Sequence, residues 1–185
     1  MMKTRGVRLE TGETFTVPQG IQRIDTRATH GWQVRYQGTK FFSDGVKGAD
    51  SSLEAAMREL LRRIASLPAP VTLQRGPSIS KSSDLPPGIS GPIVVPARRG
   101  ARTRSAVLSV LLPRFGREPQ VKSIYIGTEQ TYSRQRFDQA LARAIELRTE
   151  VIKKYEEAAT RHKRKQGLAL RSELRAARQA AARRA

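Results

Sequence analysis

The stretch Gly31-Trp32-Gln33-Val34-Arg35-Tyr36 alternates large apolar residues with polar ones, which is typical of a β-strand with one buried face. Successive side chains of a strand point to opposite sides. Trp32, Val34 and Tyr36 are therefore expected in a core, and Gln33 and Arg35 on the outward side. A strand of this kind needs partner strands and a covering layer to be stable.

The flanking sequence supplies both. Strands are expected over 20–27, 32–37 and 40–43, separated by glycine-containing turns, and residues 52–65 repeat apolar residues at helical spacing. The run Ser51-Ser52-Leu53-Glu54 fits a capping box and predicts that the helix starts there. Residues 7–9 and 14–17 flank a turn and predict a hairpin that adds strands to this sheet.

A second copy of the pattern follows. Strands are expected over 93–98, 106–112 and 121–126, and a helix from Arg134 with Ser133 as its cap. That helix has no strong stop before Gly167, and a second, weak helix is expected after it. The fold class is therefore α+β: two small modules, each a three-stranded antiparallel sheet packed on one helix, with a basic helical C-terminal tail. The expected domains are residues 1–67, a Pro/Ser/Gly-rich linker over 68–92, the second module over 93–152, and the tail over 153–185.

Charge points to the partner. The chain has 185 residues with 35 Lys+Arg against 16 Asp+Glu, a net charge of +19, and residues 153–185 carry the highest density of it. Such a balance favours a polyanionic partner, most often nucleic acid. The chain contains no Asn, so base reading would fall to Arg, Gln, Lys, Ser and Thr.

The composition argues against several other classes of protein. There is no Cys, and the two histidines, His30 and His162, are too few for a His-built metal site. No nucleophile motif or phosphate-cradling loop is present, so a non-enzyme without cofactor is expected. No apolar run is long enough for a membrane span. These features predict a cytoplasmic, nucleoid-associated protein.

Two stretches carry a resemblance to a known family. The first runs from Gly20-Ile21 through Gly31-Trp32-Gln33-Val34-Arg35 and Lys40-Phe41-Phe42 to the Glu54-Ala55-Ala56 helix. The second pairs Ser123-Ile124-Tyr125-Ile126-Gly127-Thr128 with the helix over 140–148. Together they resemble the Apetala-two/ethylene-response-factor DNA-binding domain in its bacterial and phage form. The resemblance implies a sheet lying in the DNA major groove with a helix packed behind it.

The resemblance also implies which side chains face DNA. In the first copy the implied outward positions are Gln22, Gln33, Arg35, Lys40 and Phe42, and we add the neighbouring Arg23 as a DNA-binding candidate. In the second copy the candidates are the basic turn and third-strand residues Arg98, Arg99, Arg102, Arg104, Lys122 and Tyr125. Ser109 and Ser123 stand where long basic side chains would be expected.

The C-terminal tail is expected to contact nucleic acid in addition to the two sheet-helix copies. Its candidate phosphate-binding residues are Arg161, Lys163, Arg164, Lys165, Arg171 and Arg175. The leading hypothesis is a double-stranded-DNA-binding protein, either a transcriptional regulator or an architectural factor. The alternative is an RNA-binding or ribosome-associated structural protein, since a basic α+β chain with an Arg/Ala-rich tail also suits RNA. The sequence leaves the oligomeric state open.

Overall fold

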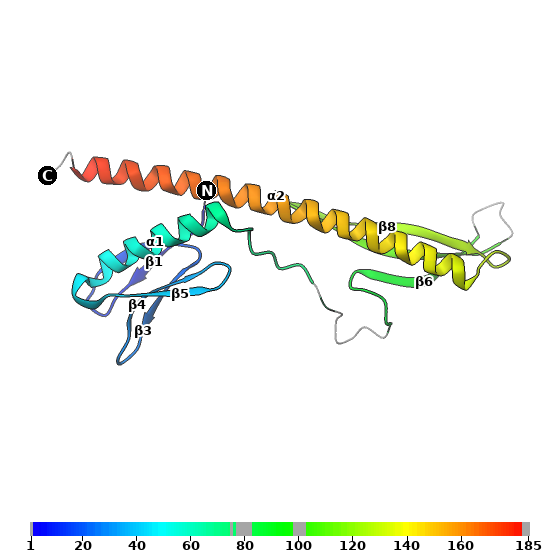
Figure 1. Cartoon of the computed structure of the whole chain (residues 1–185), viewed down its shortest axis with the longest axis horizontal. Coiled ribbons are helices and arrows are strands. Elements are labelled where there is room, and N and C mark those ends of the chain that lie inside the picture. Colours follow the sequence, from blue (N-terminus) through cyan, green and yellow to red (C-terminus); the bar gives the residue numbers. More distant parts are fainter. Residues whose placement is uncertain (1, 75, 77–82, 98–102, 183–185) are drawn as a thin grey trace. The chain divides into compact units, whose positions relative to one another are not determined.

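A computed structural model of the chain describes residues 2–74, 76, 83–97 and 103–182, and it shows an α+β protein (Figure 1). These described residues form three small antiparallel sheets and two α-helices. The chain divides into two compact units, one formed by Met1–Pro70 with Ala159–Ala185 and the other by Val71–Ala158. Each unit contains a three-stranded sheet covered by helix, which confirms the α+β class.

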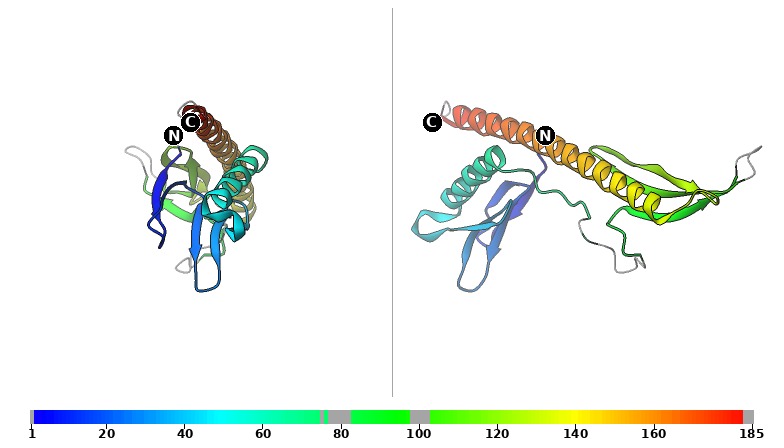
Figure 2. Two further views of the ribbon diagram at one scale, coloured as in Figure 1. Left: turned by 90° about the vertical axis from the view of Figure 1, so that its left-hand side faces the viewer. Right: turned by 45° about the vertical axis from the view of Figure 1, so that its right-hand side comes forward.

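The first unit is built on the sheet β3-β4-β5, formed by Ile21–Asp25, His30–Arg35 and Thr39–Ser43. The expected alternation is confirmed, because Trp32, Val34 and Tyr36 are all buried. The helix α1, Gly48–Ser66, covers that face with Leu53, Ala56, Leu60 and Ile64, which recur every three or four residues (Figures 1 and 2). The opposite face of the sheet is left uncovered by α1.

Two local expectations for this unit were wrong. α1 begins at Gly48, after the 3₁₀ turn Gly45–Lys47, and not at the capping box. The Ser52 hydroxyl is instead buried inside the helix, where it donates to Asp44 Oδ1 (2.5 Å) and lies 3.0 Å from the Ala49 carbonyl oxygen. A serine that bonds inside the first turns cannot also cap the helix end.

The N-terminal hairpin also differs from expectation. β1, Thr4–Arg8, and β2, Thr14–Pro18, pair only with each other and form a separate two-stranded sheet. The hairpin joins the first unit through side chains: Leu9 and Val17 are buried in the common core, and the Phe15 ring meets the Trp32 ring edge-on at 5.7 Å. It therefore extends the core and not the hydrogen-bonded sheet.

The second unit contains the sheet β6-β7-β8, formed by Ile89–Val95, Ser105–Arg114 and Arg117–Thr128. These strands are longer than expected. β7 and β8 meet at the tight turn Phe115-Gly116, where Gly116 adopts a φ of 69°. β6 begins inside the segment assigned to the linker. Leu108, Val110 and Leu112 share one face of β7, and that face belongs to the core of the unit.

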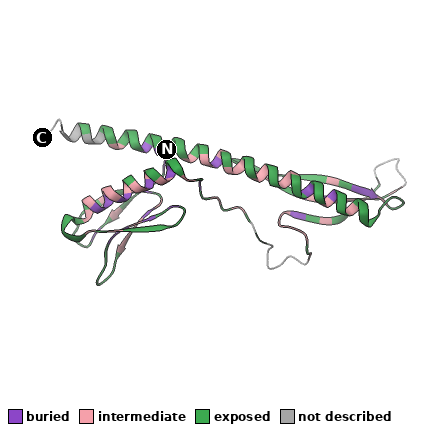
Figure 3. Cartoon of the chain, in the orientation of Figure 1, coloured by how far each residue is buried: buried purple, intermediate pink, exposed green. Residues whose placement is uncertain are grey.

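The helix α2, Arg134–Ala182, starts where the sequence predicted, and the Ser133 hydroxyl accepts the Arg136 backbone N–H (3.2 Å). The expected break at Gly167 is absent. In the first unit Gly167 lies against α1, so close that an added Cβ would stand 2.7 Å from Ile64 Cγ2. The glycine therefore serves close helix packing, and residues 159–182 are helical and belong to the first unit, although most residues of α2 are exposed (Figure 3).

Candidate nucleic-acid interface

The outward face of β3-β4-β5 carries polar side chains in register. Gln22 lies opposite Gln33, and Arg35 lies opposite Thr39. Arg35 is exposed, and its Nε donates to Gln33 Oε1 at 2.6 Å. Arginine and glutamine are the side chains that pair with guanine and adenine edges in a major groove. The expectation that Gln22, Gln33 and Arg35 share the face away from the helix is confirmed.

A groove opens beside this face, between it and the N-terminal hairpin. Its volume is about 500 Å³, and it is lined by Lys3, Thr4, Arg5, Gln19, Gly20, Ile21, Gln22 and Arg35. The backbone fixes its walls: Gln19 N–H donates to the Lys3 carbonyl at 2.9 Å, and Arg35 N–H donates to the Gly20 carbonyl at 2.7 Å. Three cations and two amides line it, and none of these lining residues carries a carboxylate. Such a groove attracts phosphate.

Sequence reasoning missed Lys3, Arg5 and Gln19 as parts of this site. The cationic pair near the N-terminus was visible, but no pattern linked it to Arg35. The link is made by tertiary structure, because the hairpin docks through Phe15 and Val17 on the same core as Trp32. A basic strand next to an outward-facing arginine is a signal only after that docking is known.

Phe41 completes the outward face. It lies opposite Gln33 in register, it is 38% exposed, and its ring lies over Gly31. A Cβ at Gly31 would stand 2.6 Å from Phe41 Cζ and 2.2 Å from the Phe42 carbonyl oxygen. Gly31 is therefore required for the ring to lie flat on β4. An exposed aromatic ring beside Gln33 offers a surface for a sugar or a thymine methyl.

Lys40 and Phe42 were expected on the outward face, and this was wrong. Register places Phe42 opposite Trp32 and Lys40 opposite Val34, both of which are core residues, so these side chains lie on the helix side. The Lys40 ammonium stands 5.3 Å from the centre of the Phe42 ring. The outward aromatic position of the strand belongs to Phe41, because consecutive residues alternate faces.

Arg23 also lies on the helix side, opposite Trp32, with its guanidinium 5.0 Å from the centre of the indole ring. It binds Asp25 (2.8 Å) and Asp44 (2.7 Å). Burial alone would lower the pKa of Arg23, but the hydrogen bonds to these two carboxylates outweigh it and raise that pKa. The Arg23 hydrogen bond in turn lowers the pKa of Asp25. Arg23 is therefore engaged in holding the sheet to the segment before α1.

The sheet of the second unit has a different outward face. Val107 lies opposite both Ile93 and Tyr125, Ser109 lies opposite Ser123, and Leu111 lies opposite Val121. Ile93, Leu111, Val121 and Tyr125 are each more than 40% exposed. None of these outward residues is charged.

The basic candidates of this unit lie elsewhere. Lys122 is exposed but pairs with Val110, so it belongs to the helix side of the sheet. Arg104 is exposed and forms an ion pair with Glu129. Arg98, Arg99 and Arg102 lie outside the described residues. The structure therefore brings only Tyr125 of the described candidates onto the outward face.

The tail candidates all lie on α2, within its first-unit part. Arg161, Arg164, Lys165, Arg171 and Arg175 are exposed. Lys163 is partly buried, and burial lowers its pKa. The exposed side chains can contact phosphates without leaving a buried environment. Lys163 is therefore the least suited of the six candidates to bind phosphate.

Metal ligation and membrane spanning can also be judged from the described parts of the chain. They contain no group of three or more His, Cys, Asp or Glu side chains that could hold a metal ion. Within the same residues, no helix combines the length and the apolar character that crossing a membrane requires. No family model, curated protein or solved structure matches the chain.

Proposed function

We propose that this protein binds double-stranded DNA through the outward face of β3-β4-β5 and the groove beside it. The observation that carries the proposal is the groove itself, where Lys3, Arg5 and Arg35 converge beside two glutamines without a carboxylate among the lining residues. Its chemistry is cationic and amide-rich, which suits a polymer with phosphates on its outside and base edges in its grooves.

The binding mode follows from the architecture. A major groove about 12 Å wide admits a narrow β-ribbon, and α1 covers the opposite face of the sheet, so the outward side chains are free to enter. Arg35 and Gln33 read base edges, while Lys3 and Arg5 bind the phosphates of the adjacent strand. The exposed cations of α2, such as Arg161, Lys165 and Arg175, add contacts to phosphates.

The role that fits this mode is that of a transcriptional regulator or an architectural factor at the nucleoid. It needs no catalytic step and no cofactor: binding alone is the activity. The two roles differ in sequence dependence, which direct base contacts generate and phosphate contacts do not.

Binding of the full chain to a fluorescent 24-base-pair duplex, titrated at several salt concentrations, tests the proposal. With six to ten phosphates contacted, affinity falls roughly a thousandfold or more between 50 and 200 mM salt. A structured RNA of equal length serves as competitor and is expected to bind more than tenfold more weakly. Absence of duplex binding at moderate salt, or a tenfold preference for RNA, would overturn the proposal.

Selection of bound sequences from a random duplex library separates the two roles. A regulator enriches a defined motif, whereas an architectural factor enriches none. Arg35 is the side chain expected to dominate any motif, through a guanine contact.

A further inference from the structure

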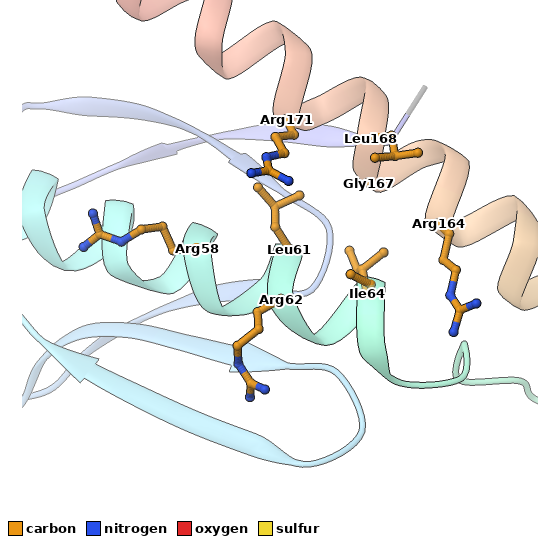
Figure 4. Close-up of a pocket in the computed structure, with 9 residues that line it drawn as sticks. Arg58, Leu61, Arg62, Ile64, Arg164, Gly167, Leu168 and Arg171 are labelled. Carbon is orange, nitrogen blue, oxygen red and sulfur yellow. The ribbon is translucent and has the colours of Figure 1, made fainter.

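A second groove lies in the first unit, between α1 and the last part of α2. It has a volume of about 470 Å³ and is lined by Arg58, Leu61, Arg62, Ile64, Ala65, Arg164, Gly167, Leu168 and Arg171. Figure 4 shows Leu61 and Ile64 rising from α1 toward α2, and Leu168 lying on α2 beside Gly167. This groove shares no lining residue with the groove beside β3-β4-β5, although Arg164 and Arg171 are also among the tail residues expected to contact phosphate.

The floor of the groove is apolar and incompletely covered. Leu168 is 67% exposed, although leucine gains about 1.5–3 kcal/mol from full burial. Leu61 is partly buried, and Gly167 lets the two helices approach at Ile64. A helix laid along two packed helices can bury such a strip with its own apolar stripe.

The rim is entirely cationic. Arg58 and Arg62 come from α1, and Arg164 and Arg171 come from α2. Arg58 and Arg62 are bound to Glu54 and Glu59 of their own helix. No carboxylate lines the groove itself, so its occupant must bring negative charge.

The positive charge of the rim distinguishes between the molecules that could occupy this groove. A second copy of this chain would bring a further net charge of +19, which opposes association at a cationic rim. DNA offers phosphates but no aliphatic group that would cover Leu61 and Leu168. An acidic amphipathic helix satisfies both features, because carboxylates pair with arginine in a bidentate manner while apolar side chains fill the floor.

We propose that the groove between α1 and α2 is the docking site for an acidic amphipathic helix of a partner protein. Two or three large apolar side chains of the partner, at spacings of three and four residues, occupy the floor over Leu61 and Leu168. Its Asp and Glu residues face Arg164 and Arg171 on one side and Arg58 on the other. The protein would thereby recruit a partner to DNA.

The probe is a displayed library of 16-residue peptides with helical apolar/polar patterning and randomised positions, selected against the full chain. The expected result is enrichment of acidic sequences with apolar residues at i, i+3 or i+4, and i+7. Synthetic copies of the enriched peptides are then titrated against the wild-type protein and against variants of the groove. Leu168→Gln and Arg171→Gln should each weaken binding by about tenfold, and neither residue is buried.

Matched controls sit nearby. Arg175→Gln removes an exposed arginine from the same helix, outside the groove, and Leu111→Gln removes an exposed leucine of the second unit. Both should leave peptide affinity within about twofold of the wild type. The proposal is overturned if no acidic sequence is enriched, if the controls weaken binding as much as Leu168→Gln, or if leucine-free acidic peptides bind equally well.

Binding of duplex DNA to the same variants tests whether the groove is instead a phosphate site. Leu168→Gln should leave DNA affinity unchanged, and duplex DNA should not displace the bound peptide. Displacement by DNA, together with equal loss of DNA affinity in Arg171→Gln and Arg35→Gln, would make the groove a phosphate site and overturn this proposal. Failure of DNA binding with intact peptide binding would instead overturn the proposed function alone.

Discussion

The two three-stranded sheets of this chain share strand order and direction but not surface chemistry. Outward residues of β3-β4-β5 include Gln22, Gln33 and Arg35, next to a cationic groove. The outward residues Ile93, Val107, Ser109, Leu111, Val121, Ser123 and Tyr125 of β6-β7-β8 are uncharged, and Leu111 and Val121 are exposed. A repeated topology thus does not imply a repeated function. Among the described residues, Arg35, Gln22 and Gln33 of the first sheet are the outward side chains that we propose to contact DNA.

The cores of the two units also differ in their origin. The second unit draws its core from residues 85–151, which are close in sequence. The first unit is built from residues 2–67 and then receives Leu170 and Leu174 from the far end of the chain. Its sole tryptophan, Trp32, is fully buried, so tryptophan fluorescence reports the first unit alone.

Among the proposed variants, Gly31→Ala should destabilise the first sheet most. The added methyl group would meet the Phe42 carbonyl oxygen at 2.2 Å, and backbone cannot move aside cheaply. We expect a loss of about 3 kcal/mol or more in the free energy of unfolding. Denaturant titration followed by Trp32 fluorescence measures it. Gly6→Ala, in β1 with nothing within 4 Å of the new Cβ, is the matched control and should cost under about 1 kcal/mol.

The distant part of the first core is tested by Leu170→Ala. Leu170 is 7% exposed, and its truncation should destabilise the first unit by about 2–3 kcal/mol. Leu168→Ala, two residues earlier and 67% exposed, should change stability by less than about 0.5 kcal/mol. Equal effects on the Trp32 transition would mean that the end of α2 does not belong to this core.

The contrast between the outward faces is tested by Arg35→Ala and Ser123→Ala, one on each sheet. Loss of Arg35 should weaken duplex binding by about 1–3 kcal/mol, concentrated at one base position if it reads guanine. Ser123→Ala should leave binding unchanged. Anisotropy titration on one selected duplex and on its single-base variants gives both numbers, and a loss for Ser123→Ala as large as that for Arg35→Ala would contradict the contrast.

The smallest expected effect is the pH dependence of stability that arises from Glu59. Hydrogen bonds from Arg62 and Arg63 lower the pKa of Glu59 from 4.5 to about 2, and Arg63 also donates to the Tyr36 and Gly38 carbonyls, tying α1 to the sheet. A carboxyl group whose pKa is lower in the folded state than in the unfolded state stabilises the folded protein at pH values above its unfolded pKa. This contribution is complete above about pH 4.5 and is lost as the pH falls toward 2.

The comparison of wild type with Glu59→Gln checks this sign. The difference in Tm, followed by Trp32 fluorescence, should be greatest near neutral pH and should shrink below pH 4.5. A difference that grew as the pH fell would contradict the role assigned to Glu59. Glu54→Gln, which removes the exposed i,i+4 ion pair with Arg58, is the matched change and should show a weaker pH dependence.

The α+β class, the faces of β4 and β7 and the start of α2 could be read from the sequence, because period-two alternation and a serine cap are local signals. Lys40 and Phe42 could not be placed, since the run Lys40-Phe41-Phe42 does not alternate and only pairing with Trp32 sets its phase. α2 continues through Gly167, which packs closely against Ile64, and no local pattern reveals that contact. The cationic groove likewise needs the hairpin docked beside Arg35.

The central claim is that DNA binds at the first sheet and not the second, and a pair of triple variants tests it most directly. One variant carries Lys3→Gln, Arg5→Gln and Arg35→Gln. The other carries Arg114→Gln, Arg117→Gln and Lys122→Gln, an equal change of charge among exposed residues of the second unit. The measurement is the slope of log affinity for duplex DNA against log salt concentration.

Lys3 and Arg5 are the two phosphate contacts among the three residues of the first variant, so the salt slope should become shallower by about 2. We expect this change of slope, with a large loss of affinity, for the first variant and a nearly unchanged slope for the second. Equal reductions in both variants would mean that only net charge matters, and a reduction confined to the second would place the DNA on the other sheet. Either result would contradict the account.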